Sequence, residues 1–354
     1  MKKKALLFPV ALLICIALLV AGCAAPAPEI TPPTEPEVEV FEWDMQTLLP
    51  AGLPMQADIF DVFADRVRAA SGGRLDITVH PAGAIVGTFE MFDAVSDGVF
   101  EVYMANPVYW SGKDAGFAAL GSPAMGFPEV WQLDAWYRYG GGLELAQELY
   151  AEYNLHFLPI NYGPDSIHSK IRLSSVEDFE GIKIRSPHGM PADLFAKLGA
   201  AVTVVPGGEV YSSLEKGIIE AAEWGSPDLH YVMGWHEVTD YIIYPAFHQP
   251  TNGNEVTVNM DAWQELPDDL KVIFTLAVEE LGHRMQQYMA YRDYEAMNQM
   301  VEYGNEWVEM PAEELAKIQP LAVEVWDDWA EMSPAAKEII ESQKAFMRLL
   351  KVIE

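Results

Sequence analysis

The chain has 354 residues, of which 50% are hydrophobic, and its 53 acidic and 22 basic residues give a formal net charge of -31 at pH 7. This length is enough for two lobes that each bury a core of their own. So acidic a chain argues against binding to nucleic acid or to anionic lipid, because both depend on basic side chains.

The first 22 residues have the three parts of a secretory signal peptide. Lys2, Lys3 and Lys4 form a positive segment, an apolar run covers 5–20, and Ala21-Gly22 supplies small residues at a cleavage point. The apolar run is shorter than the ~20 residues that a membrane span needs, so export is favoured over the alternative of an uncleaved anchor. Removal of the three lysines with this segment moves the formal charge from -31 to -34.

Cys23 directly follows the cleavage point, and Val20-Ala21-Gly22-Cys23 resembles a bacterial lipobox, in which the cysteine is lipidated and becomes the first mature residue. The other cysteine, Cys15, lies inside the leader, so we expect no disulfide and no cysteine-based metal site. Residues 23–40 carry this cysteine and a stretch rich in Pro, Glu and Ala, which predicts a disordered linker. The expected location is the periplasm or the outer face of the cytoplasmic membrane, with the lipid on Cys23 as the only membrane contact.

From residue 41 the chain alternates predicted strands and helices. Strands are predicted at 40–49, 74–80, 101–105, 156–161, 182–186, 203–205 and 221–224, and helices at 57–70, 88–96, 135–153 (interrupted at Gly140 to Gly142), 191–198 and 209–216. Residues 261–303 and the last forty or so are mostly helical, and Pro267-Asp268-Asp269 opens the longest helix. This βαβ rhythm predicts the α/β class, with parallel strands under helices.

Several segments carry a resemblance to a known family. A strand over 182–186 contains Lys183-x-Arg185, residues 173–181 (LSSVEDFEG) precede it, and residues 206–217 (PGGEVYSSLEKG) and 219–224 (IEAAEW) follow it in order. They resemble the substrate-binding subunit of tripartite ATP-independent periplasmic (TRAP) transporters, over essentially the whole body from Phe41. Further stretches, 108–113, 140–145 and 244–250, are similar to the branch that binds 2-oxo and 2-hydroxy monocarboxylates, sometimes with a metal ion.

The resemblance implies a solute-binding protein of two α/β lobes, with a cleft between them, crossover strands and a long connecting helix. Lobe I would comprise 41–162 and 251–290, lobe II 163–250 and 291–332, and a C-terminal helix 333–354. Such a protein captures a small organic acid between its lobes and delivers it to the TRAP membrane subunits.

Two residues match ligand-binding positions of that family. Arg185 matches its carboxylate-binding arginine, and the planar guanidinium suits a carboxylate bidentately. The residues by themselves also allow a surface arginine paired with Asp178 or Glu180. Trp224 falls where the family often has a second ligand contact, and its alternative is an ordinary core tryptophan.

The chain also departs from the family pattern. Asp165 aligns with a loop where relatives carry Arg or Gln, and Gln249 stands where the monocarboxylate branch usually has Glu. Together with Glu223, these residues offer oxygen ligands that suit a hard cation such as Ca²⁺ or Na⁺ bridging to the ligand carboxylate, although no cofactor is required. The alternative is that Asp165 accepts hydrogen bonds from hydroxyl or amino groups of a different ligand. From the first lobe, Tyr109 and Trp110 could close the cleft.

The residue patterns of common enzymes are missing from the sequence. There is neither an HExxH pattern nor a GxSxG elbow, and the one mature cysteine is assigned to the anchor. A binding protein is therefore favoured over a secreted, lipid-anchored hydrolase acting on a small carboxylate or sugar, and over a purely adhesive lipoprotein. Apolar residues at helical spacing over 342–350 have no obvious partner within two lobes, which predicts a homodimer, the alternative being a helix packed on its own body.

Overall fold

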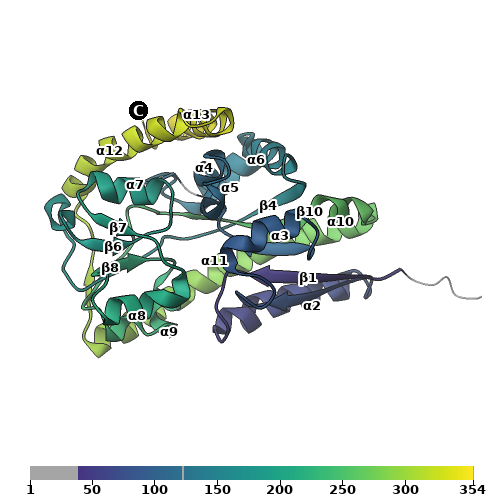
Figure 1. Cartoon of the computed structure of the whole chain (residues 1–354), viewed down its shortest axis with the longest axis horizontal. Helices are drawn as coiled ribbons and strands as arrows, with labels where there is room; N and C mark the ends of the chain where they lie inside the picture. Colours follow the sequence, from purple (N-terminus) through teal and green to yellow (C-terminus); the bar gives the residue numbers. More distant parts are fainter. Residues whose placement is uncertain (1–38, 122, 354) are drawn as a thin grey trace, which may run out of the picture. The chain divides into compact units, whose positions relative to one another are not determined.

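The computed structural model describes residues 39–121 and 123–353, so the predicted signal peptide, Cys23 and nearly all of the predicted linker lie outside the described residues. In the described part, the strands gather into two sheets, and helices surround them (Figure 1). No helix there combines the length and the apolar character that a membrane crossing requires.

The first sheet has the strand order β2-β1-β3-β10-β4. Its strands are β1 (Phe41–Thr47), β2 (Leu75–His80), β3 (Val102–Ala105), β4 (Leu155–Tyr162) and β10 (Asn252–Asn259). β1 runs parallel to β2 and β3, whereas β10 is antiparallel to both β3 and β4. The predicted parallel arrangement holds for β1, β2 and β3, whereas β10, which is not among the predicted strands, is antiparallel because the chain enters it from the second sheet and not through a helical crossover within the first.

The second sheet is built from six short strands in the order β11-β9-β5-β8-β6-β7. They are β5 (Ile167–Ser169), β6 (Lys183–Arg185), β7 (Ala201–Thr203), β8 (Ala221–Glu223), β9 (Tyr241–Ile243) and β11 (Glu306–Val308). β6 is parallel to β7 and β8, and β5 is antiparallel to β8 and β9. Both sheets are thus mixed, within the α/β class that the sequence predicts.

The chain passes repeatedly between the two sheets. It leaves β4 for β5 through residues 163–166, returns from β9 to β10 through residues 244–251, and reaches β11 after the long helix α11 (Asp268–Tyr303). We call 163–166 and 244–251 the two crossing segments. They are hydrogen-bonded to each other, since the Asp165 N–H donates to the Gln249 carbonyl (3.1 Å) and the Ala246 N–H donates to the Asp165 carbonyl (3.0 Å). The lobe boundaries given above stay a prediction.

The helices cover the sheets on several sides. They are α2 (Val62–Ala70), α3 (Met91–Ser96), α4 (Gly116–Gly121), α5 (Val130–Tyr139), α6 (Gly142–Ala151), α7 (Met190–Lys197), α8 (Val210–Glu215), α9 (Pro227–Val232), α10 (Met260–Glu265), α11, α12 (Ala312–Ala330) and α13 (Pro334–Leu349). Gly141 has a φ of +81° between α5 and α6, and this conformation interrupts the helical segment at the glycines where the sequence predicts an interruption.

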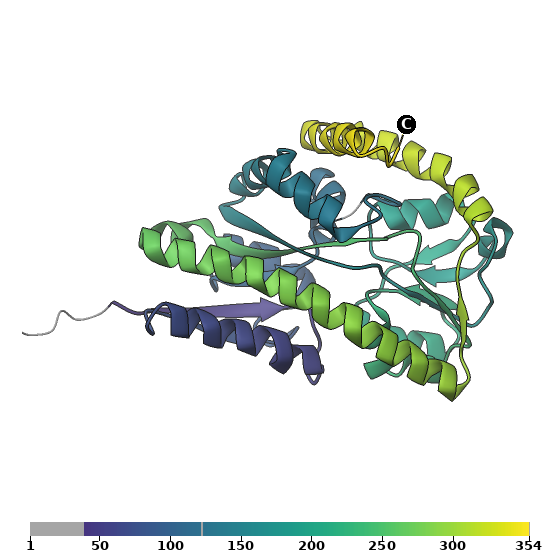
Figure 2. The same cartoon turned by 180° about the vertical axis from the view of Figure 1, so that it is seen from behind.

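The longest helix, α11, joins the two sheets. It begins at Asp268, after Pro267, and Gly304 with a φ of +129° ends it 36 residues later, which corresponds to a rod of about 54 Å. Figure 2 shows α11 running across both sheets. It contacts α2 and β4 beside the first sheet and α9 and β11 beside the second.

The C-terminal helix α13 packs on its own chain. Its buried side chains include Ile339, Ile340 and Met347, and it contacts α4, α6 and α12. Figure 1 shows α12 and α13 lying together along one side of the molecule. The reason for predicting a homodimer was therefore wrong, because α4 and α6 bury the apolar face that had no assigned partner.

Candidate ligand-binding site

Arg185 stands at the end of β6 with a side chain that is 0% exposed. Its Nε donates to the carbonyl of Val205 (3.0 Å), and its Nη1 donates to the backbone carbonyl of Glu223. Nη2 has no hydrogen-bond partner among the described residues. The alternative of a surface arginine paired with Asp178 or Glu180 is contradicted by this burial. A guanidinium held by two carbonyls with one nitrogen unpaired is positioned to receive an anion.

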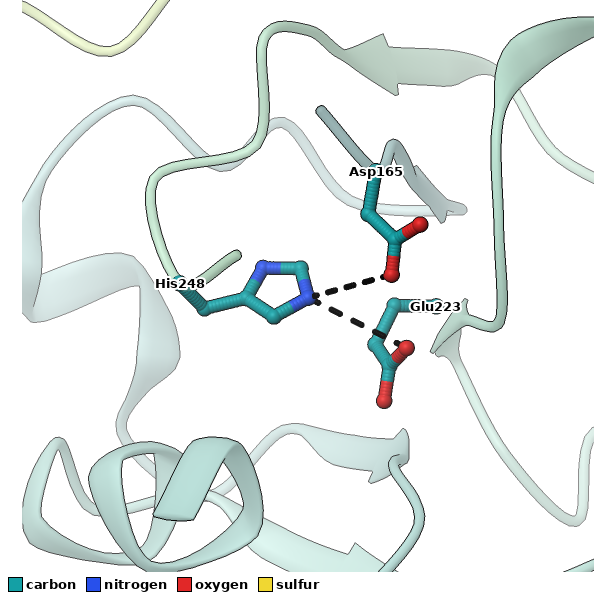
Figure 3. A group of neighbouring side chains, drawn as sticks. All are labelled: Asp165, Glu223 and His248. Carbon is teal, nitrogen blue, oxygen red and sulfur yellow. Dashed lines mark ion pairs between the residues drawn. The ribbon is translucent and has the colours of Figure 1, made fainter. Parts of the chain in front are cut away.

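Two buried carboxylates and a histidine lie beside this arginine (Figure 3). Asp165 comes from the first crossing segment, Glu223 is the last residue of β8, and His248 comes from the second crossing segment. The His248 Nε2 lies 4.0 Å from Asp165 Oδ2 and 3.9 Å from Glu223 Oε2. Glu223 Oε1 lies 3.7 Å from Arg185 Nη1. Four segments that are separate in sequence thus place four titratable side chains in one buried space.

The charges in this space are not balanced. With a neutral His248, the two carboxylates outnumber the single arginine by one negative charge, and burial makes that imbalance costly. Burial, together with the neighbouring Glu223, raises the pKa of Asp165 well above its ordinary value. Burial would also raise the pKa of Glu223, but His248 and Arg185 outweigh it and lower the value. The pair therefore calls for one additional positive charge, which a proton on Asp165, a proton on His248 or a bound cation can supply.

A chain of amides holds Asp165 and Gln249 in place. Asn252, the first residue of β10, donates from Nδ2 to Asp165 Oδ1 (2.5 Å) and accepts at Oδ1 from the Gln249 Nε2 (2.6 Å). The Nδ2 of Asn106 donates to the same Asn252 oxygen (3.3 Å). These contacts engage Oδ1 of Asp165 and leave Oδ2 as the oxygen nearer His248.

Trp224 follows Glu223 directly and is half-buried. Its indole Nε1 donates to the hydroxyl of Tyr109 (3.2 Å), so this contact links the second sheet to the η3 turn (Pro107–Trp110) that follows the first sheet's β3. The indole lies against Gly207, where a Cβ atom would stand only 2.4 Å from the ring. Tyr109 and Trp224 thus meet across the two halves of the molecule.

The structure brings together most of the residues singled out from the sequence. Arg185, Glu223 and Asp165 are neighbours, with Gln249 tied to Asp165 through Asn252. Trp110 is placed differently: it is buried in the core, and its indole donates to Glu255 (2.6 Å).

Sequence reasoning missed His248 and Asn252. His248 carried a signal, since it adjoins Gln249 in the stretch 244–250 that resembles the monocarboxylate-binding branch. Asn252 carried none, because an asparagine at the start of a strand has many ordinary roles.

Comparisons of the sequence and of the structure with known proteins agree with each other. The sequence profile of the bacterial extracellular solute-binding proteins, family 7, matches residues 45–332. The monocarboxylate 2-oxoacid-binding periplasmic protein of Nostoc sp. is 30% identical over 312 residues, covering 86% of this chain and 84% of that protein.

Solved structures resemble the chain over most of its length. A TRAP transporter solute-binding protein from Bordetella bronchiseptica RB50, a mixed-occupancy dimer with copurified calcium and picolinate, superposes with a TM-score of 0.83 at 27% identity, covering 88% of this chain and 92% of that one. A TRAP periplasmic solute-binding protein from Colwellia psychrerythraea, with bound calcium and pyruvate, gives a TM-score of 0.82 at 26% identity and covers 89% and 96%.

Proposed function

The chain belongs to the bacterial extracellular solute-binding proteins of family 7, and we propose that it binds a small 2-oxo or 2-hydroxy monocarboxylate through a bound calcium ion. Proteins of this family capture small organic acids for TRAP membrane transporters and are receptors, not enzymes. The alternative of a secreted hydrolase therefore has no support.

The observation that carries the ligand class is the free end of Arg185. Its Nε proton is already donated to Val205, so a carboxylate cannot use the side of the guanidinium. The end formed by Nη1 and Nη2 retains protons, and Nη2 has no partner among the described residues. We infer that the ligand carboxylate meets this end of the fork, where two parallel N–H donors match two carboxylate oxygens.

Charge counting supports calcium together with a single carboxylate. Arg185, Asp165 and Glu223 sum to -1 with a neutral His248, a calcium ion brings the sum to +1, and one monocarboxylate brings it to zero. A dicarboxylate would leave an uncompensated negative charge in a buried space, which is costly. The relatives from Bordetella and Colwellia, which hold calcium with picolinate and with pyruvate, fit this count.

The residues present fit a hard cation. The candidate ligand atoms of Asp165, Glu223 and His248 all lie within 4.8 Å of one another, about twice a calcium–oxygen distance of ~2.4 Å. Oxygen ligands suit Ca²⁺, and Glu223 Oε1 has no hydrogen-bond partner among the described residues. We assign Asp165 and Glu223 as ligands and keep Gln249 as a third oxygen donor. We do not assign His248, which lies between the carboxylates, as a ligand, because imidazole nitrogen is a poor ligand for calcium.

Tethering through Cys23 belongs to the proposal as well. An exported, periplasmic location agrees with the family. The lipid anchor rests on the lipobox-like Val20-Ala21-Gly22-Cys23 and on the spacer that follows it. A Cys23→Ser variant is expected to appear in the soluble fraction while the wild type stays with membranes.

Titration calorimetry with pyruvate and lactate, in calcium buffer and in EDTA, tests the ligand. We expect binding in calcium, weaker binding in EDTA, and little binding of succinate. Arg185→Lys is expected to weaken binding nearly as much as Arg185→Ala, by about thirtyfold to several thousandfold, because loss of a desolvated charged partner costs ~2–5 kcal/mol.

Replacing the buried, positively charged side chain of Arg185 can also lower the stability of the fold, so a matched control is needed. Lys344→Ala removes a buried lysine that pairs with Asp327 and Glu341 on the C-terminal helices. It is expected to lower the melting temperature without changing the affinity for pyruvate. An Arg185→Ala protein that binds pyruvate as tightly as wild type would overturn the site assignment.

A further inference from the structure

A groove of about 700 Å³ lies outside the ligand site, between α5, β4 and α11. Its walls include Leu143, Leu158, Pro159 and Ile160, and its floor carries Asp134 and Asn161. α11, which forms one wall, is the same helix that continues across to the second sheet (Figure 2). This size is within the range of sites that receive a ligand or a large side chain.

The polar end of the groove holds a carboxylate and an unsatisfied amide oxygen, with Arg138 and His283 nearby. Asn161 is 4% exposed, and its Nδ2 donates to Asp134 Oδ1 (2.7 Å), while its own Oδ1 has no partner among the described residues. Asp134 forms no ion pair with any described lysine, arginine or histidine, and burial raises the pKa of its carboxyl. The nearby Arg138 is instead paired with Glu279 (3.3 Å) at the exposed edge. A half-buried carboxylate and an unpaired buried acceptor thus point to an N–H-rich cation.

The mouth of the groove is apolar and exposed to solvent. Tyr139 is 80% exposed, Trp131 57% and Leu276 59%. Exposed aromatic side chains around a charged pocket are typical of protein interfaces, where a central arginine or lysine is buried and aromatic residues surround it. A small metabolite would not use this outer ring, so the occupant is better matched by a protein.

We propose that this groove docks a membrane subunit of the transporter, receiving a lysine or arginine side chain on Asp134 and Asn161 while apolar neighbours of that residue cover Trp131 and Tyr139. Charge complementarity argues for a basic occupant through Asp134, which has no ion pair among the described residues, whereas Glu279 is paired with Arg138 and Glu280 with Arg66 and Arg284. Membership of a TRAP receptor family supplies the partner, and the proposal does not depend on which acid is bound.

The test measures docking directly and without ligand. Purified membrane subunits in lipid nanodiscs are captured on a sensor, and the soluble receptor is titrated over them by interferometry, with and without saturating pyruvate and calcium. Asp134→Asn and Tyr139→Ala are each expected to weaken docking by about tenfold or more, and added salt is expected to weaken the wild type but not Asp134→Asn. Tyr303→Ala, which changes a tyrosine that is 62% exposed at the far end of α11, is expected to leave docking unchanged.

Calorimetry on the same soluble variants separates this proposal from the previous one. All of them are expected to bind pyruvate with wild-type affinity, because none of the substituted residues lies in the ligand site. Should Asp134→Asn fail to fold, the surface change Tyr139→Ala still decides the matter. Wild-type docking in both groove variants, or an equal loss in Tyr303→Ala, overturns the groove as the docking surface.

Discussion

Gly207 and Gly208 form a matched pair for testing whether Trp224 belongs to the ligand site. A Cβ atom on Gly207 would stand 2.4 Å from the Trp224 ring, whereas a Cβ on Gly208 meets nothing within 4 Å. Neither glycine has a positive φ, so alanine is compatible with both backbones. The two substitutions add the same methyl group and differ only in what it touches.

The size of the effect follows from the contact. To restore an ordinary separation of at least 3.4 Å, the Trp224 indole or the turn must shift by about 1 Å. Overpacking of this kind costs ~1–3 kcal/mol. A shift of 1 Å is also enough to break the 3.2 Å hydrogen bond to Tyr109. If the same 1–3 kcal/mol is lost from the ligand-bound state, the affinity falls by about fivefold to 150-fold.

Calorimetry with pyruvate and calcium measures the affinity, and urea denaturation establishes that each variant is folded. Gly207→Ala is expected to weaken binding within that range, and Gly208→Ala to match the wild type. A folded Gly207→Ala protein with wild-type affinity would show that Trp224 does not form a wall of the site. An equal loss in Gly208→Ala would show that the loop, and not the indole contact, matters.

Three further substitutions probe the site and the core. Asn252→Ala should weaken calcium-dependent binding by about ten- to a hundredfold in calorimetry, because it removes a charged hydrogen bond worth ~1.5–3 kcal/mol, while Asn259→Ala at the other end of β10 should not. Asp165→Ala should abolish the sensitivity of binding to EDTA; binding that ignores EDTA in the wild type yet falls in this variant would instead mean that Asp165 contacts a ligand hydroxyl or amino group. For Glu255, burial raises the pKa to about 7 from 4.5, so the stabilisation of its protonated form is full below pH 4.5 and is lost as pH rises through 7. Glu255→Gln should therefore be more stable than wild type at pH 8 by at most about 3 kcal/mol in urea denaturation, and a gain confined to pH 5 would contradict the reasoning.

The regular part of the fold was predictable from the sequence, and the crossing strand was not. The predicted strands at 40–49, 74–80 and 101–105 correspond to β1, β2 and β3, and Pro267 marks the start of α11 as expected. β10 escaped prediction because its residues, NGNEVTVN, lack an apolar run although all of them are buried. Its polar side chains find partners in other elements, as Asn259 does with the carbonyl of Val95, and such tertiary contacts leave no periodic signal.

The candidate site, like the fold, could be predicted from the sequence only in part. The family resemblance indicated Arg185 and Trp224 as ligand contacts, and residue chemistry suggested a cation beside Asp165, Glu223 and Gln249. The roles of these residues, and of Gln249, Trp224 and Tyr109, stay predictions that the substitutions above test. What the sequence could not supply is the convergence of 163–166 and 244–251, because segments some eighty residues apart meet through the pairing of β10 with β4 at one end and of β5 with β9 at the other.

The two crossing segments have a consequence for release. They join the lobes and also carry Asp165, His248 and Gln249, and backbone hydrogen bonds fasten one to the other. A change in the angle between the lobes must alter backbone torsions in these segments, and we expect it to move Asp165 and His248 together relative to Arg185 and Glu223 on the second sheet. We therefore expect the acid to be released when the lobes move apart, without any other group competing for Arg185. On this hypothesis, the rate at which the acid leaves depends on how easily these two short segments bend.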